Sequence, residues 1–286
     1  MGKSNVDASW IEGVIKDFTA SSANTMKNDS NEPAWAEPII GYSNGADPLY
    51  DFYKKDIGSF YVLPIEYLKH AFPDSEAKPQ ELSVISWVLP QTDATKKDHR
   101  KETQWPCERW ARSRIFGEEV NDELRRHLVK ALIDAGVEAV APMLSPLWRR
   151  ETSPKYGFAS TWSERHAAHV AGLGTFGLSD GLITPKGKAH RVGSVIANIA
   201  LPSGRRPYTG HHAYCLFYAK HTCGNCMKKC PVNAITERGH DKVKCSAYVS
   251  ATHTYVESHY GFKGYGCGLC QVGVPCESCI PAGIDA

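Results

Sequence analysis

Ten cysteines stand in this 286-residue chain, and nine of them fall between Cys215 and Cys279. The densest stretch reads Cys223-Gly-Asn-Cys226-Met-Lys-Lys-Cys230-Pro231. Its gaps of two and three residues and its closing Cys-Pro are typical of segments whose thiolates hold [4Fe–4S] clusters, with the last cysteine reaching a second cluster. The spacing therefore predicts electron-transfer chemistry in the last quarter of the chain.

The ligand count fits two clusters. Lys220 occupies the position where this pattern has its first cysteine, and Cys215 is the substitute. By the crossover rule, one cluster takes three early thiolates and a returning fourth, and the other takes Cys230 with three later ones. The expected sets are Cys215, Cys223, Cys226 and Cys276 for the first cluster, and Cys230, Cys245, Cys267 and Cys270 for the second.

Other readings of the cysteines remain open at this point. Cys279 competes with Cys276 for the returning role, although we favour Cys276. The paired two-residue spacings also suit a tetrahedral zinc site, which would leave five neighbouring cysteines unexplained. Disulfides need an oxidising compartment, and no secretory signal is visible. Cys107 stands alone and is interpreted as a small buried hydrophobic residue.

The elements that must position this segment have an α+β pattern. Helices are expected over residues 8–19 and 64–72, and the longest over 120–135. Apolar runs at 82–89, 137–144 and 193–201 predict strands, and the strand–helix–strand order suggests a βαβ unit in an α/β sheet reductase domain. The segment 21–48 is interpreted as a surface loop.

These patterns predict three parts. Residues 1–80 form an irregular and helical segment that packs on the core. Residues 81–205 form an α/β domain for cobalamin and substrate, and residues 206–286 form a bacterial-ferredoxin-like module with two [4Fe–4S] clusters.

Polar residues that could donate a proton precede a glycine-rich turn. Tyr156, Glu164 and His166 are the candidate catalytic acids, because reduction at carbon needs a proton near the developing negative charge. Glu164 and Arg165 could instead form a structural or solvated pair on a helix.

The turn itself holds Gly172, Gly174 and Gly177. These glycines have the spacing of the dinucleotide-binding fingerprint, but that fingerprint follows a strand, whereas a helix is expected before this turn. Nicotinamide binding is therefore not expected. A tight turn against a flat cofactor is the functional interpretation, and ordinary turn glycines are the alternative. The basic group Lys186, Lys188, His190 and Arg191 could meet an anion, although a solvated face is favoured.

Composition limits the kinds of partner and the cellular location that we expect. The formal net charge is +2, with 33 Lys and Arg against 31 Asp and Glu, so neither a polyanion nor a membrane surface is the default partner. No run approaches the roughly 18 apolar residues that cross a bilayer, and the polar start lacks a leader pattern. We expect a cytoplasmic protein.

The order of motifs resembles epoxyqueuosine reductase and the catalytic domain of corrinoid reductive dehalogenases. The resemblance rests on residues 171–177, 182–185, 223–231, 245–248 and 266–271. It implies two [4Fe–4S] clusters and a base-off cobalamin beside the nearer one, with electrons coming from a low-potential donor of the ferredoxin or flavodoxin type.

Two departures bear on the substrate. The queuosine enzymes carry Arg-Asp-Tyr-His where this chain reads Arg114-Ile-Phe-Gly-Glu118, and they continue into a helical-repeat domain that helps to hold tRNA. We therefore expect a small-molecule substrate and not tRNA. The alternative function is a ferredoxin-type electron carrier for a partner enzyme, without substrate chemistry of its own.

Overall fold

A four-stranded sheet forms the centre of the protein in a computed structural model that describes residues 6–284. Its strand order is β1 (Ile39–Asn44), β2 (Ser83–Pro90), β8 (His190–Ala197) and β3 (Ala139–Val140), and each neighbouring pair is antiparallel. The architecture is α+β, as the sequence predicts.

The strand–helix–strand unit is split rather than continuous. Helix α5 (Glu108–Asp134) joins β2 to β3, but β8 lies between these two strands and pairs with both. The expectation of a simple βαβ pair is therefore wrong. The strand expected over 137–144 is also shorter, because β3 has two residues and a 3₁₀ turn at Pro142–Leu144 follows it.

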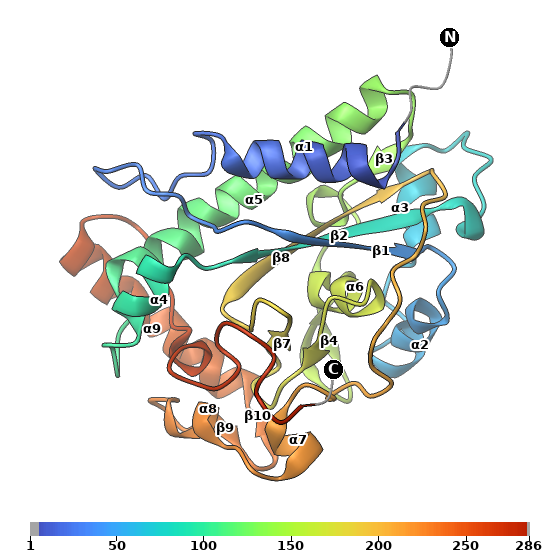
Figure 1. Ribbon diagram of the computed structural model, residues 1–286. Coiled ribbons are helices and arrows are strands. Elements are labelled where there is room, and N and C mark those ends of the chain that lie inside the picture. Colours follow the sequence, from blue (N-terminus) through green and yellow to red (C-terminus); the bar gives the residue numbers. More distant parts are fainter. Residues whose placement is uncertain (1–5, 285–286) are drawn as a thin grey trace.

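Helices cover both faces of the sheet (Figure 1). Helix α1 (Ala8–Ala20) and α5 pack on one face against Ile85, Trp87 and Leu89. Helices α2 (Pro48–Asp56), α3 (Pro64–Ala71) and α6 (Glu164–Val170) pack on the other face, where Val84 and Ile196 point. Because apolar residues of β2 alternate between two cores, every residue of that strand is buried.

Two elements were not expected from the sequence. Strand β1 and helix α2 lie in or directly after the segment interpreted as a loop, and β1 is an edge strand of the central sheet. By contrast, α1, α3, β2 and β8 lie within a few residues of the expected positions, and α5 begins twelve residues before the expected Val120.

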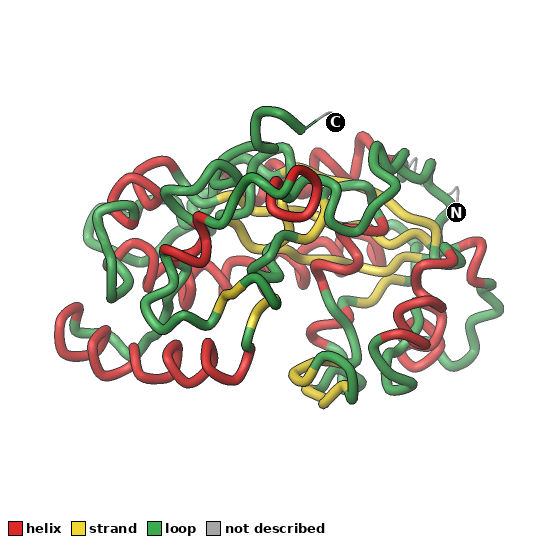
Figure 2. The backbone as a smooth tube through the Cα atoms, turned by 90° about the horizontal axis from the view of Figure 1, so that it is seen from below, coloured by secondary structure: helices red, strands yellow, loops and turns green. Residues whose placement is uncertain are grey.

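Apart from helix α9, the remaining elements are short. They lie mostly below the sheet in the view of Figure 1. Figure 2 shows the β4–β5 hairpin standing out from the body of the chain. The cysteine segment contains one long helix, α9, whose length the sequence did not indicate. The bounds are α4 (Asp93–His99), β4 (Arg150–Ser153), β5 (Gly157–Ser160), β6 (Thr175–Phe176), β7 (Leu182–Ile183), α7 (Leu216–Lys220), α8 (Asn225–Lys228), β9 (Ile235–Thr236), β10 (Gly239–His240) and α9 (Lys242–Tyr260), with 3₁₀ turns at Pro79–Glu81 and Leu269–Gln271.

No helix within residues 6–284 is both long and apolar enough to cross a membrane.

Candidate redox centre

Four cysteines surround one small cavity below the sheet. Cys215 precedes α7, Cys226 lies in α8 with Cys223 just before it, and Cys276 arrives from the loop near the end of the chain. All four line the same cavity, together with Gly177, Leu178 and Lys188. This is the set that the crossover rule predicts for the first cluster.

The other four predicted ligands form a second group. Burial, together with the neighbouring Cys270, Cys245 and Cys230, raises the pKa of the Cys267 thiol to about 12. The thiol of Cys230 accepts a hydrogen bond from the backbone N–H of Ala234 at 3.1 Å. The structure therefore brings Cys230, Cys245, Cys267 and Cys270 together, and Cys226 and Cys270 are neighbours across the two groups.

The two remaining cysteines lie outside both groups. Cys279 is exposed, and its thiol donates to the carbonyl of Pro275 at 3.9 Å, away from the cavity. Cys107 is buried at the start of α5, where burial raises its pKa to about 12. A buried neutral thiol of this kind behaves as a small hydrophobic residue.

A turn from the sheet domain holds the loop that carries Cys276. The backbone N–H of Lys188 donates to the carbonyl of Cys276 at 2.9 Å. Gly187 has φ +77°, and a Cβ at this position would lie 2.1 Å from the carbonyl oxygen of Glu277. Glu277 is itself buried, and both of its carboxylate oxygens accept from Arg100 Nε at 2.9 Å. The returning cysteine is thus positioned by contacts with residues far from it in sequence.

Lys188 is buried between the two cysteine groups. Its side chain lines the first cavity, and the residue is only 3% exposed. Its Nζ donates to the hydroxyl of Ser179 at 3.3 Å. Burial lowers the pKa of this ammonium, but the nearby thiols of Cys276, Cys270 and Cys226 outweigh burial and raise it. The expectation that this basic group forms a solvated face is wrong for Lys188.

Among residues 6–284, no three Cys, His, Asp or Glu side chains are arranged to hold one metal ion. The sulfurs around a four-iron cube lie farther apart than the ligands of a single zinc ion. Cluster ligation by the two groups of cysteines therefore stays a prediction, and so does the zinc alternative.

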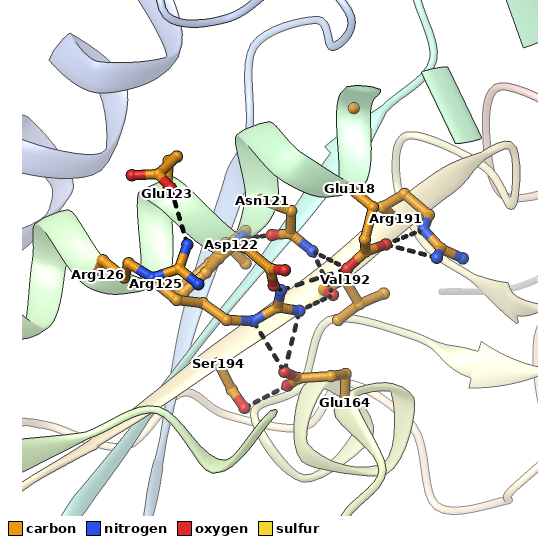
Figure 3. A network of polar contacts seen from close by, with 12 residues as sticks. Glu118, Asn121, Asp122, Glu123, Arg125, Arg126, Glu164, Arg191, Val192 and Ser194 are labelled. Carbon is orange, nitrogen blue, oxygen red and sulfur yellow. Dashed lines mark hydrogen bonds and ion pairs between the residues drawn. The ribbon is translucent and has the colours of Figure 1, made fainter. Parts of the chain in front are cut away.

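Glu164, a candidate acid, belongs to a buried ionic network that joins α5, α6 and β8 (Figure 3). Its carboxylate pairs with Arg125 at 3.2 Å and accepts from the Ser194 hydroxyl. Arg125, whose side chain is 1% exposed, also contacts Asp122 at 2.6 Å. Burial raises the pKa of Glu164, and Arg125 opposes this effect. The partner of Glu164 is therefore Arg125 and not the neighbouring Arg165.

A second carboxylate of this network stays ionised. Glu118 accepts from Arg191 Nε at 2.7 Å and pairs with Arg125 at 3.3 Å. Burial alone would raise the pKa of Glu118, but Arg191, Arg125 and Arg114 together lower it to about 2.

Tyr156 lies on the turn between β4 and β5 and is 41% exposed. Its hydroxyl donates to Asp56 at 2.6 Å, and Lys242 of α9 donates to its carbonyl at 3.1 Å. Burial and the hydrogen bond to Asp56 raise its pKa. The exposed hydroxyl retains its proton at neutral pH and is held by α2.

His166 lies on α6 among other rings. Its ring is 4.6 Å from Tyr53, 4.8 Å from Phe176 and 6.2 Å from His211, measured between centroids. Burial lowers its pKa well below the usual range, and His211 and Arg165 contribute. The imidazole is therefore neutral at pH 7, which makes it a base or a hydrogen-bonding group more than an acid.

Two further polar side chains flank His166. Arg165 precedes it on α6, and His211 lies in the segment before α7. Both are exposed to solvent, yet burial lowers the pKa of Arg165 and brings that of His211 to about 4. Sequence reasoning missed His211, since no motif marked it.

The three glycines are explained by close packing of the chain on itself. A Cβ at Gly172 would lie 2.9 Å from the carbonyl of Arg205, and one at Gly174 would lie 2.3 Å from that of Ile183. Gly172 also has φ +80°, and Gly177 packs on the Ile183 side chain. These contacts account for all three positions, and cofactor binding by them stays a prediction.

Comparisons with known proteins identify the fold. A catabolic reductive dehalogenase in complex with 3-bromo-4-hydroxybenzoic acid matches with a TM-score of 0.53 and 13% identity, over 95% of this chain and 36% of that one. A structure described as suggesting a mechanism for B12-dependent dehalogenation matches with a TM-score of 0.52 and 13% identity, over 95% and 37%.

Epoxyqueuosine reductase from Bacillus subtilis matches with a TM-score of 0.44 and 18% identity, over 87% of this chain and 63% of that one. The chain thus spans about a third of the dehalogenases and less than two thirds of this reductase. No protein-family model and no curated protein sequence matches the chain. The fold is similar to that of part of the reductive dehalogenases, in agreement with the resemblance seen in the sequence.

Proposed function

We propose that the protein is an iron–sulfur reductase that passes electrons through two [4Fe–4S] clusters to a cobalamin-based site acting on a small molecule. One observation carries the proposal: eight cysteines form two groups of four, and the first group surrounds a single cavity. Cys215, Cys223, Cys226 and Cys276 would hold the first cluster, and Cys230, Cys245, Cys267 and Cys270 the second. The adjacent groups, with Cys226 near Cys270, provide a short path for electrons.

The surface beside α6 where Arg165, His166 and His211 lie is the proposed cofactor and substrate site. Arg165, His166 and His211 present donors and acceptors there, which suits the amide side chains of a corrin ring. Cobalamin, when bound, supplies a cobalt centre that delivers electrons to carbon. The fold of the dehalogenases supports this placement.

The chain itself must supply the proton. Tyr156 is our first choice, because its hydroxyl is exposed and protonated and is oriented by Asp56 at 2.6 Å. Glu164 is second, since its proton would compete with the charge of Arg125. His166 is neutral and is better suited to orient a substrate by hydrogen bonding.

Anaerobic purification followed by iron, sulfide and cobalt analysis tests the proposal. About eight irons per chain with tightly bound corrinoid is the expected result. Material that contains only zinc would refute it. Eight irons with no corrinoid uptake in a titration would favour the electron-carrier alternative, although a carrier has no need of the large central sheet and its covering helices.

A further inference from the structure

We propose that Lys188 is the buried counter-charge of the first cluster and raises its reduction potential. This inference rests on the proposed clusters. It adds Lys188, whose side chain binds no iron but whose positive charge favours one direction of electron flow.

The burial of Lys188 is the first argument. Lysine is almost never fully buried without a partner, because removing an ammonium from water costs several kcal/mol. Lys188 is 3% exposed, and the hydrogen bond to the neutral Ser179 cannot offset that cost. Within residues 6–284, no carboxylate forms an ion pair with Lys188, and the cavity that its side chain lines is bounded by four cysteines. The missing anion must therefore come from the thiolate groups.

The position of Lys188 is the second argument. Its side chain lines the cavity of the first cysteine group, and its backbone N–H donates to the carbonyl of Cys276. All four cysteines of the first group line the same cavity as Lys188, and none of the four cysteines of the second group does. The charge of Lys188 therefore acts more strongly on the first cluster than on the second.

The consequence for the potential follows from charge balance. A cluster with four thiolate ligands is an anion, and reduction adds one electron and hence one more negative charge. A nearby buried cation stabilises this reduced form more than the oxidised form, because the low-dielectric surroundings screen the interaction weakly. Lys188 thus raises the potential of the first cluster relative to that of the second, which favours electron movement from the second cluster towards the first.

The test compares Lys188→Gln with Lys188→Arg and with Lys186→Gln. Lys186 is exposed and two residues away, so its variant removes the same charge from the surface of the same turn. EPR-monitored redox titration of anaerobic protein gives the midpoint potentials of both clusters, and iron and sulfide content gives the loading. A Cys276→Ser variant identifies the signal of the first cluster, because it changes one of that cluster's proposed ligands.

In Lys188→Gln we expect the ratio of reduced to oxidised first cluster at a fixed potential to fall at least tenfold, which is about 59 mV for one electron. The second cluster should shift less, and Lys188→Arg and Lys186→Gln should retain the original potentials. An unchanged potential in fully loaded Lys188→Gln overturns the inference.

Loss of the first cluster in Lys188→Gln but not in Lys188→Arg also supports a required positive charge, whereas loss in both variants overturns it. Wild-type protein without iron and sulfide would overturn the proposed function itself, which separates the two failures.

Discussion

Two regions of the molecule are stabilised by different means: the central sheet with its covering helices, and the cysteine segment, residues 215–279. In β2 every residue is buried, and its side chains join two large apolar clusters on opposite faces of the sheet. In α9, the longest element of the cysteine segment, only Thr252 and Val256 are buried among 19 residues. The apolar cluster of the cysteine segment is smaller and is built partly of cysteines, such as Cys215 and Cys226. Under the proposed ligation, we expect the cysteine segment to need its bound clusters to fold and the sheet not to need them.

Removal of the proposed clusters should produce the largest difference between the two regions. Oxidative release of iron in the presence of a chelator should speed amide hydrogen exchange in residues 215–280 by about 100-fold or more, because metal-binding free energy is also folding free energy. Exchange in 83–90 and 190–197 should change little. Hydrogen exchange measured by mass spectrometry checks this, and equal loss of protection in both regions would contradict the comparison.

Arg125→Met should produce the next largest effect, and this effect should lie in the sheet domain. The substitution leaves Glu164 and Asp122 without their buried partner, which we expect to cost about 3–5 kcal/mol of unfolding free energy. The matched control is Arg126→Met on the same helix, where the exposed pair with Glu123 should contribute less than about 1 kcal/mol.

Urea denaturation followed by tryptophan fluorescence measures both variants. Equal stability of the two variants would show that the ionic network around Arg125 does not stabilise the folded sheet. Retention of the iron content in Arg125→Met would further show that the two regions are stabilised independently.

The smallest effect concerns acid stability. Burial lowers the pKa of His190 to about 4, and its Nδ1 is buried without a partner while Nε2 contacts the Leu182 carbonyl at 2.8 Å. The unfolded chain takes up a proton near pH 6.5 and the folded one does not, so stability falls as pH decreases from about 6.5 towards 4. This histidine alone contributes a slope of up to about 1.4 kcal/mol per pH unit.

His190→Gln should remove that slope, and the exposed His70→Gln should not. Unfolding measured between pH 7 and 5.5 separates the two variants. An unchanged pH dependence in His190→Gln would mean that this imidazole is not kept neutral by the fold.

The sequence indicated some of these features and concealed others for physical reasons. Continuous apolar runs revealed β2 and β8, because strands buried on both faces have no polar alternation. Strand β1 was concealed by its Gly, Ser and Asn residues, and α9 by an exposed surface that leaves no apolar stripe. The pairing of β3 with β8 depends on contacts between distant residues, which periodicity does not report.

In the cysteine site and the candidate acids, too, the sequence indicated some features and concealed others. Cysteine spacing and the crossover rule predicted that Cys215, Cys223, Cys226 and Cys276 act together, and these four line one cavity. Ligation of clusters by the eight cysteines stays a prediction. The burial of Lys188 was not visible, because lysine in a basic stretch is ordinarily exposed and only the fold covers it. The acids were also difficult to rank from sequence, because Arg125 lies 39 residues from Glu164.

The returning position of Cys276 has a consequence for biosynthesis. Three sulfurs of the first group leave the ribosome about 50 residues before the fourth, which is seated by Gly187 and Lys188 of the sheet domain. Under the proposed ligation, iron delivery cannot be completed during translation of the early motif, and the first inorganic centre closes only after the polypeptide has emerged through Cys276 and its sheet has formed. Maturation should then act as a checkpoint that rejects chains lacking Cys276.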